Sequence, residues 1–460
     1  MKYIEPTLYE KIQVIAGAIA KKGGRALLVG GAVRDMVMNI AIKDIDIEVH
    51  GLSDDVLFDT LNNFGHVGLV GKSFGVLRIY GLDVDWSLPR TDSPGRKPIV
   101  VVDPFMSLED AARRRDLTMN AMFFDIGTQE LIDFFQGQED IKNKILRAPD
   151  IRFFEQDPLR FYRVMQFTSR FAMYPDQELN SVCEKMDIRS ISRERIEQEF
   201  RKMLLLSERP SLGIRWLRRI NRLHEVVPEL AATIGIMQNP QWHPEGDVFE
   251  HTMQVLDAAA IIVRKYDNEF DKLVLLYAAL CHDLGKTTTT VEVKGVLKSI
   301  GHEIESKKYA KTMMKRITHD VDLINAVASL VLHHMAPLQF VSNKAQLPAY
   351  KRLANKLDHR VTMEMLIDLC LADKRGRNGE GHLPLSKNFE EVELFKKQVE
   401  AAGVFTGKEK PILKGLDLLD VFQPGPQLGR ALAYAYELQI DKSIRDKDYL
   451  KECVLKKLKN

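Results

Sequence analysis

The chain has 460 residues, of which 45% are hydrophobic and 28% are charged, as in globular proteins. A chain of this length exceeds one ordinary hydrophobic core, so we expect two to four domains. No uninterrupted apolar run reaches the roughly 18 residues that cross a bilayer, and the four cysteines show neither metal-type spacing nor a disulfide framework. We therefore expect a cytoplasmic protein without a membrane partner.

The net charge of +2 neither indicates nor excludes a nucleic-acid partner, but the basic residues are unevenly distributed. Residues 151–222 contain 15 Lys or Arg against 10 Asp or Glu. Such a segment is either a solvated helical surface or an electrostatic footprint for nucleic acid. Four arginines cluster in "RWLRRINR", and helical spacing would place them on one RNA-facing surface: Arg215, Arg218, Arg219 and Arg222.

The first 150 residues have the pattern of a mixed α/β domain. Short β-rich runs, punctuated by Gly, Asp and Pro, occupy residues 26–30, 45–49, 75–88 and 98–103. Residues 55–65 between them have helical spacing. From Asp157 onward the strand signals fade, and Ser192 is a candidate N-cap for a later helix. The remainder of the chain is therefore predicted to be helical.

Two aspartates one residue apart, Asp44 and Asp46, stand in the apolar run "KDIDIEV". Carboxylates at i and i+2 on a strand point to the same face, about 7 Å apart. Placing like charges side by side is costly unless a cation lies between them, and oxygen ligands favour Mg²⁺ or Mn²⁺. The alternative for such a pair is a strand end with both side chains in solvent.

A double glycine upstream of these aspartates favours the metal interpretation. In "LLVGGAVRD", Gly30 and Gly31 follow a predicted strand and would let a ligand approach the backbone closely, with Arg34 beside them. A phosphate cradle before a pair of metal-binding carboxylates is the arrangement that phosphoryl or nucleotidyl transfer requires. The third acid is expected to be Asp85 in "LDVDWSL".

Four ordered motifs now resemble one family. "GGAVRD", "KDIDIEV", "RRRDLTMNAM" and "QDPLRFYR" occur in the order found in class II tRNA nucleotidyltransferases, the CCA-adding enzymes and related poly(A) polymerases. The resemblance covers about residues 25–230 and departs from the family pattern at Gln156, where a Glu is usual. It implies template-independent addition of CCA to the tRNA 3′ end from CTP and ATP.

The resemblance also implies residue roles. Asp44 and Asp46 would hold two Mg²⁺ ions that activate the RNA 3′-hydroxyl and bind the triphosphate. The implied nucleotide-binding residues are Gly30, Gly31, Arg34, Arg114, Arg115, Asp116, Asn120, Asp157, Arg160 and Arg163. Among them, Asp157 and Arg160 would contact the Watson–Crick edge of the incoming base. A carboxylate and a guanidinium one helical turn apart can stand in for a template base.

A second constellation lies downstream, around "LCHDLGK". His282 and Asp283 are adjacent there, "FEHT" supplies His251, and "LADKRGR" supplies Asp373. Imidazole and carboxylate ligands together suit Mn²⁺, Ni²⁺, Fe²⁺ or Zn²⁺; a buried His–Asp hydrogen bond is the simpler alternative.

The ordered pattern resembles HD-superfamily phosphohydrolases. That resemblance implies metal binding by His251, His282, Asp283 and Asp373, a second metal on His302 and His333, and Ni²⁺ or Mn²⁺ as the ion. The domain would either hydrolyse phosphoesters such as 2′,3′-cyclic phosphates or mainly hold RNA.

The expected fold is α+β: a polymerase-β-like nucleotidyltransferase sheet with helices, an all-α neck and body, and an all-α HD domain. The predicted parts are residues 1–150, 151–235, 236–390 and a helical tail, 391–460. Alternative products are poly(A), CC alone or A alone. The last 20 residues carry only seven Lys or Arg against four Asp or Glu, and residues 90–112 leave room for a flexible loop, which favours complete CCA addition. An inactive nucleotide-sensing regulator is the alternative of another class, and the protein would be a monomer or homodimer.

Overall fold

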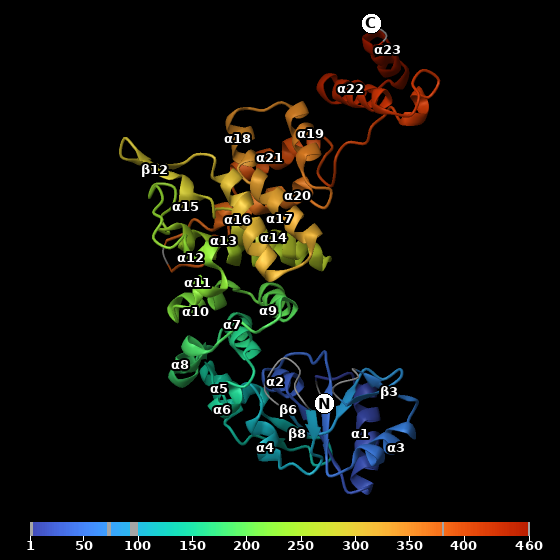
Figure 1. The fold of residues 1–460 in the computed structure, drawn as a ribbon, viewed down its shortest axis with the longest axis vertical. Coiled ribbons are helices and arrows are strands. Elements are labelled where there is room, and N and C mark those ends of the chain that lie inside the picture. Colours follow the sequence, from blue (N-terminus) through green and yellow to red (C-terminus); the bar gives the residue numbers. More distant parts are fainter. Residues whose placement is uncertain (1–2, 71–74, 93–99, 380, 459–460) are drawn as a thin grey trace. The chain divides into compact units, whose positions relative to one another are not determined.

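A computed structural model describes residues 3–70, 75–92, 100–379 and 381–458 (Figure 1). The chain divides into two compact units, which are described separately below. The first comprises Met1–Ser207 with Leu212–Arg222, and the second comprises Glu208–Ser211 with Leu223–Asn460. The four-part division expected from the sequence stays a prediction. Residues 93–99, within the expected flexible loop, lie outside the described residues.

A seven-stranded mixed sheet forms the centre of the first unit, in the order β3-β4-β5-β2-β1-β8-β9. Its strands are β1 (Arg25–Val29), β2 (Asp46–His50), β3 (Val67–Val70), β4 (Val76–Ile79), β5 (Asp85–Ser87), β8 (Phe123–Asp125) and β9 (Leu131–Ile132). β6 (Arg90–Asp92) and β7 (Val100–Val102) form a separate pair. Strands are thus confirmed in all four β-rich runs of the sequence.

Alternation along β2 separates the core from the site. Ile47 and Val49 are fully buried, whereas Asp46 is exposed on the opposite face. That opposite face continues into Leu27 of β1, which pairs with Glu48 and packs against Ala111 and neighbouring residues of α4 (Leu108–Arg113). The carboxylates therefore border an apolar layer on one side of the sheet.

Helices complete the first unit. They are α1 (Pro6–Lys21), α2 (Gly31–Val37), α3 (Asp54–Asn62), α5 (Gly137–Asn143), α6 (Ile151–Phe154), α7 (Leu159–Phe171), α8 (Gln177–Lys185), α9 (Arg193–Leu206) and α10 (Ser211–Arg219). The helical spacing of residues 55–65 corresponds to α3, and Ser192 occupies the N-cap position of α9 as predicted. α7 packs against α9, so the segment after Asp157 forms a helical layer.

The second unit is predominantly helical. Its longer helices are α13 (Val248–Ile262), α14 (Glu269–Cys281), α16 (His302–Ile317), α17 (Val321–His333), α18 (Ala336–Ser342), α19 (Leu347–Lys356), α20 (Met363–Arg375), α21 (Glu390–Ala401), α22 (Pro426–Lys442) and α23 (Lys447–Leu458). α11 (Leu223–Val226), α12 (Pro228–Ala231) and α15 (Lys286–Thr289) are single turns. α13, α14, α17 and α20 pack against one another and bury their apolar faces.

The expected helical HD region is confirmed, and a β-hairpin that the sequence analysis did not predict is inserted in it. β12 (Thr290–Val293) pairs antiparallel with β13 (Val296–Ser299). The connecting residues, Lys294 and Gly295, both have positive φ values, 53° and 75°. Two such residues between β-branched runs match the tight turn of a two-residue hairpin. The sequence signal was therefore present in "TVEVKGVLKS".

One helical segment in the second unit is long and apolar enough to cross a membrane by length and composition. It spans Val321–Ser342, with a mean hydropathy of 1.3. However, 56% of its most apolar 18-residue stretch is buried inside the protein, where Val327, Leu330 and Val331 belong to the core. Burial in the core accounts for its apolar composition.

Candidate active sites

Strand register brings together two carboxylates of the first unit. Asp46 of β2 pairs in parallel register with Asp85 of β5, so both side chains lie on the same face. They line a cavity of about 320 Å³ together with Glu48, Arg114 and Arg115. Partial burial, followed by the charges of Asp85 and Asp44, raises the pKa of Asp46. The cavity therefore brings two like-charged carboxylates together beside cationic side chains.

The other member of the predicted aspartate pair, Asp44, precedes β2 and is exposed. Asp85 accepts a 2.6 Å hydrogen bond from Arg78 Nε, which neutralises part of the local charge. Among the described residues, the tight groups of three or more potential metal ligands all lie in the second unit, so these acids do not form one. Asp46 and Asp85 nevertheless lie on one face and repel each other. A divalent cation bound between them would attract both carboxylates and remove that repulsion.

The double glycine forms the turn between β1 and α2. Gly30 has φ +60°, a conformation that suits glycine, and an added Cβ would lie 3.3 Å from Arg115 Nη1. Gly31 is equally confined, because a Cβ there would meet Arg34 Nη2 at 3.4 Å. The glycines therefore allow two arginines to approach the backbone closely.

Arg34 differs from the expectation that it contacts phosphate. Its side chain is buried, and it does not line the cavity. Its Nη1 donates to Asn120 Oδ1 at 2.9 Å, and its Nε and Nη2 donate to Asp35 Oδ1 at 2.8 and 2.7 Å. These bonds hold the arginine away from a ligand, and they orient Asn120.

The "RRRD" motif divides into two sets of contacts. Arg114 and Arg115 line the cavity, and Arg115 Nη2 lies 3.1 Å from Glu48 Oε2. Asp116 lies deeper and accepts hydrogen bonds from Asn120 Nδ2 at 3.0 Å and from Arg163 Nε at 2.6 Å.

Asp116 is a fixed anion within that network. Although burial disfavours its charge, the guanidinium groups of Arg163 and Arg160 hold the pKa of Asp116 at about 2. The carboxylate is therefore ionised at neutral pH. Of the motif residues, Asp116, Asn120 and Arg163 support the cavity wall, whereas Arg114 and Arg115 face the cavity itself.

The two predicted base-reading residues, Asp157 and Arg160, contact other parts of the first unit. Asp157 precedes α7 and lies 3.1 Å from Arg195 Nη2, a residue that the sequence analysis missed. Arg160 donates to two backbone carbonyls, Phe153 O at 2.8 Å and Arg114 O at 2.7 Å. Arg160 therefore links α7 to the "RRRD" segment. The only signal for Arg195 was its place in the basic segment.

The prediction that four arginines share one helical face is wrong for Arg222. α10 ends at Arg219, and the chain turns at Asn221, which has φ 53°. Arg222 is buried, and its guanidinium donates to the carbonyls of Cys183, Glu184 and Met186 at 2.7, 3.1 and 2.9 Å. It therefore satisfies carbonyls at the end of α8. Arg218 and Arg219 are exposed, and Arg215 is partly exposed.

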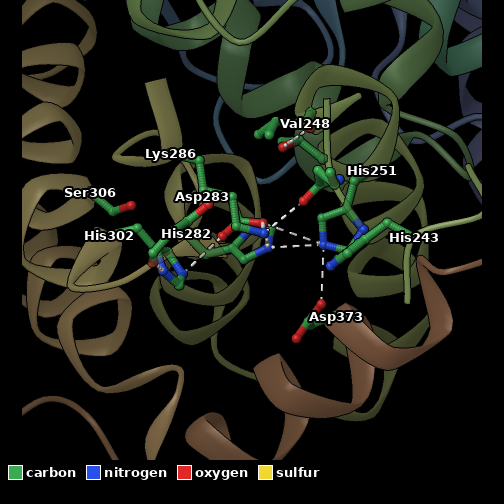
Figure 2. A network of polar contacts seen from close by, with 12 residues as sticks. His243, Val248, His251, His282, Asp283, Lys286, His302, Ser306 and Asp373 are labelled. Atoms are coloured by element: carbon green, nitrogen blue, oxygen red, sulfur yellow. Dashed lines mark hydrogen bonds and ion pairs between the residues drawn. The ribbon is translucent and has the colours of Figure 1, made fainter. Parts of the chain in front are cut away.

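The second unit gathers the predicted HD residues into one buried cluster, in which they point toward one another (Figure 2). His251 comes from α13, His282 and Asp283 follow α14, and Asp373 comes from α20. His251 Nε2 lies 3.1 Å from Asp373 Oδ1 and 3.3 Å from His282 Nε2. His282 Nε2 lies 3.2 Å from Asp283 Oδ2.

A second group shares Asp283. His302 Nε2 lies 3.2 Å from Asp283 Oδ1 and 3.1 Å from His334 Nε2. Asp283, His302 and His334 offer ligand atoms within 4.8 Å of one another. The prediction of His333 is wrong by one position: His333 lines a different cavity with residues such as Glu303 and Phe340. Consecutive helical residues point about 100° apart, and the sequence could not decide which member of the pair faces inward.

Two further residues complete the cluster and were missed by the sequence analysis. Glu245 Oε1 lies 2.6 Å from His251 Nδ1 and 2.9 Å from His243 Nδ1. Burial disfavours the charge of Glu245, but its close contacts with both histidines lower its pKa to about 2. The "HPEGD" loop before His251 was the available signal. A carboxylate bonded to the far nitrogen of a ligand histidine fixes the ring tautomer and orientation.

The carboxylates of the cluster and His334 are in the protonation state that a divalent metal requires. Burial opposes the charge of Asp283, but His282 and Lys286 lower its pKa well below the usual value, and Arg377 does the same for Asp373. Burial lowers the pKa of His334 to about 3. Metal ligands must be deprotonated, and these three groups meet that requirement. Although burial opposes their charge, hydrogen bonds to carboxylates raise the pKa of His251 and of His302, so a bound ion would displace a proton from these two rings. Two groups of closely spaced donors, joined by Asp283, fit one or two ions.

Comparison with known proteins gives one family match in each unit. The family described as "Poly A polymerase head domain" matches residues 26–147, and the family described as "HD domain" matches residues 248–374. The Multifunctional CCA protein of Pasteurella multocida is 31% identical over 370 residues, covering 76% of this chain and 84% of that protein. That of Leptothrix cholodnii is 31% identical over 425 residues, covering 89% and 94%.

Solved structures show the same fold. The Thermotoga maritima CCA-adding enzyme complexed with tRNA has a TM-score of 0.61 at 18% identity, covering 99% of this chain and 97% of that one. The Bacillus stearothermophilus CCA-adding enzyme in complex with CTP has a TM-score of 0.64 at 18% identity, covering 99% and 100%. The chain belongs to the multifunctional CCA protein family, whose members are tRNA nucleotidyltransferases, and it carries an HD domain.

Proposed function

We propose that this protein adds or repairs the 3′-terminal CCA of tRNA, using CTP and ATP without a nucleic-acid template. The observation that carries the proposal is the register pair Asp46 and Asp85, which line one cavity with Arg114 and Arg115. Carboxylates that repel one another beside cationic side chains suit the joint binding of divalent metal and triphosphate. Its partners are the tRNA 3′ end and the two nucleotides, and its compartment is the cytoplasm.

Asp44, Asp46 and Asp85 would hold Mg²⁺ in the transferase site. Bound Mg²⁺ would supply activation of the RNA 3′-hydroxyl and neutralisation of the developing phosphate charge. Arg114 and Arg115 orient the phosphates and ribose from the cavity wall. Asp116, Asn120, Arg34 and Arg163 hold that wall in place through their mutual hydrogen bonds.

Base selection is assigned to Asp157 and Arg160, the residues of the fourth motif. Arg195 holds the Asp157 carboxylate through its ion pair. The hydrogen bonds that Arg160 donates to two backbone carbonyls hold its guanidinium group beside the "RRRD" segment. Of the basic cluster, Arg215, Arg218 and Arg219 contact tRNA phosphates, whereas Arg222 supports the fold.

We further propose that the HD domain hydrolyses phosphoesters such as 2′,3′-cyclic phosphates. His251, His282, Asp283 and Asp373 would hold a divalent transition metal, with Ni²⁺ and Mn²⁺ as candidates. Asp283, His302 and His334 would hold a second one. Such ions, when bound, supply an activated water as the nucleophile. The support is the convergence of imidazole and carboxylate donors in one buried cluster.

A single incubation series tests the transferase proposal. The purified chain is given a tRNA that lacks its last three nucleotides, with CTP and ATP separately and together, and the products are sequenced. We expect CC with CTP alone and CCA with both. A poly(A) product, CC alone in the presence of both nucleotides, or A alone would each indicate the corresponding alternative enzyme. Absence of any product would indicate the nucleotide-sensing regulator.

A further inference from the structure

A cavity of about 630 Å³ opens onto the HD cluster. Asp283, His302, His334 and Asp373 contribute to its lining, so the groups that would hold metal face this space. The loop before α13 forms another part of the lining through Trp242 and His243. A molecule that occupies the cavity therefore contacts both the HD cluster and this loop.

Trp242 is unusual among the three tryptophans of the chain. Its side chain is 60% exposed, whereas Trp86 and Trp216 are 0% and 2% exposed. Leaving an indole in water forgoes the free energy of burying a large apolar ring. The fold thus leaves its one exposed tryptophan in the wall of the HD cavity, next in sequence to His243.

The loop that carries Trp242 is anchored at several points. The backbone N–H groups of Trp242 and His243 each donate to Asn239 O at 3.0 Å. The neighbouring Gln238 accepts a 2.7 Å hydrogen bond from Lys286, which is also paired with Asp283. On its other side His243 is bonded to Glu245. Hydrogen bonds and ion pairs therefore connect the loop that carries the indole to the HD cluster.

Positive charge surrounds the same cavity. Lys286, Lys374 and Arg377 line it and are ion-paired with Asp283, Glu391 and Asp373 at 2.8, 3.1 and 2.7 Å. Lys298 of β13 also lines it, is exposed, and has no ion pair within the described parts of the chain. An exposed ammonium beside an exposed indole offers one group for an anion and one for a flat apolar ring.

We propose that the HD cavity binds a nucleotide whose base stacks on Trp242 while its phosphate lies beside the HD cluster, within reach of Lys298. Any base has a π-face, so the stack accepts all four bases. A nucleotide substrate explains why the cavity has an exposed aromatic ring at all, since a simple phosphate ester would leave the ring in water. The reaction of the phosphate rests on the hydrolysis proposed above, whereas binding of the base does not.

Fluorescence tests the base subsite without relying on hydrolysis. The Ni²⁺-loaded full-length protein is titrated with adenosine 3′-phosphorothioate, a slowly hydrolysed analogue, while tryptophan emission is recorded. We expect a saturable quench that is absent in Trp242→Phe, because the other two indoles are buried. Inorganic phosphate should give no quench. Absence of a saturable quench, or an equal quench in Trp242→Phe, would overturn the proposal.

Kinetics separate the subsite from the hydrolysis itself. With 2′,3′-cyclic AMP, Trp242→Ala should raise KM about fivefold or more, the effect of losing one stacked base, while kcat changes little. Gln241→Ala, an exposed neighbour, is the matched control and should retain the KM. Methyl riboside 2,3-cyclic phosphate, which lacks a base, should show equal KM for both proteins. Hydrolysis with an unchanged KM in Trp242→Ala would overturn the base subsite; a quench without hydrolysis would support the subsite and refute only the proposed hydrolysis.

Discussion

The two candidate sites of this chain are built in opposite ways. In the transferase site, Asp46 is exposed and is aligned with Asp85 by backbone pairing between β2 and β5. In the HD site, His251 and His282 are fully buried and are positioned by side-chain contacts between helices. A sheet face that is open to solvent can receive a triphosphate and an RNA end together. A buried cluster instead holds its ligands in place before any substrate arrives.

Their electrostatics differ in the same sense. Partial burial and the charges of Asp85 and Asp44 raise the pKa of Asp46, so nearby arginines do not fully offset the repulsion at this carboxylate. In the HD site burial is opposed by His282 and Lys286, which lower the pKa of Asp283. The comparison indicates that counter-charge comes largely with the ligands in the first site and largely from the protein in the second.

The strongest way to break this comparison is to remove a transferase carboxylate. Asp46→Ala should lower nucleotide addition by about 100-fold or more, because a misplacement of about 1 Å at the reacting centre costs that much. The rate is measured with a tRNA that lacks CCA. Asp83→Ala, an exposed acid near Asp85, is the control and should retain most activity. Near-normal addition by Asp46→Ala would remove Asp46 from the catalytic set.

Much of this organisation was predictable from the sequence. The spacing of apolar and turn residues predicted β1 and β2, and the ordered motifs predicted the carboxylates and the His251, His282, Asp283 and Asp373 cluster. The parallel pairing of β2 with β5 was not predictable, because it joins segments far apart in the chain. His334 was missed because a one-residue change of helical phase decides which neighbour faces inward. Arg222 was misplaced because the end of α10 was not foreseen.

Glu245 provides a way to sharpen the account of the buried site. Glu245→Gln keeps the shape of the side chain but removes the charge that orients His251. Loss of such a partner typically weakens metal affinity 10- to 100-fold. Titration of the metal-free protein with Ni²⁺ would measure this change, with Glu400→Gln on the exposed face of α21 as the control. Unchanged Ni²⁺ affinity would show that His251 needs no such partner.

Base selection provides a test of the open site. Asp157→Ala should reduce discrimination between CTP and the other nucleotides by about tenfold, since one base-edge contact is worth roughly 1–3 kcal/mol. Arg195→Ala should have the same direction and a smaller effect, because it removes only the partner of that carboxylate. Relative kcat/KM values for CTP, ATP, UTP and GTP give the answer. Uniformly slower addition with unchanged selectivity would make Asp157 a structural residue.

The basic segment gives the smallest expected effect. Replacing Arg218 and Arg219 by Ala should weaken tRNA binding and flatten the plot of log K against log salt by about one to two units, one for each lost phosphate contact. The KM for CTP should stay nearly constant. An unchanged salt dependence with normal affinity would place the RNA elsewhere.

Arg222→Ala is the matched contrast within the same segment. It should leave the salt dependence unchanged and lower the free energy of unfolding by about 2 kcal/mol, because charged hydrogen bonds to buried carbonyls are lost. Denaturant unfolding of the full chain measures the difference. A changed salt slope with unaltered stability would reverse the roles assigned to Arg222 and its neighbours.

The central claim is that the two sites carry separate chemistry, and His282→Ala tests it most directly. Metal content, hydrolysis of 2′,3′-cyclic AMP with added Ni²⁺, and CCA addition with Mg²⁺ are measured on the same preparation. We predict that the variant loses bound transition metal and hydrolysis while CCA addition stays within about twofold of the unmodified protein. The reason is that the carboxylates of the transferase site come from β2 and β5, whereas the candidate metal ligands of the HD site come from a separate set of residues. Parallel loss of both activities in a folded variant would contradict the claim.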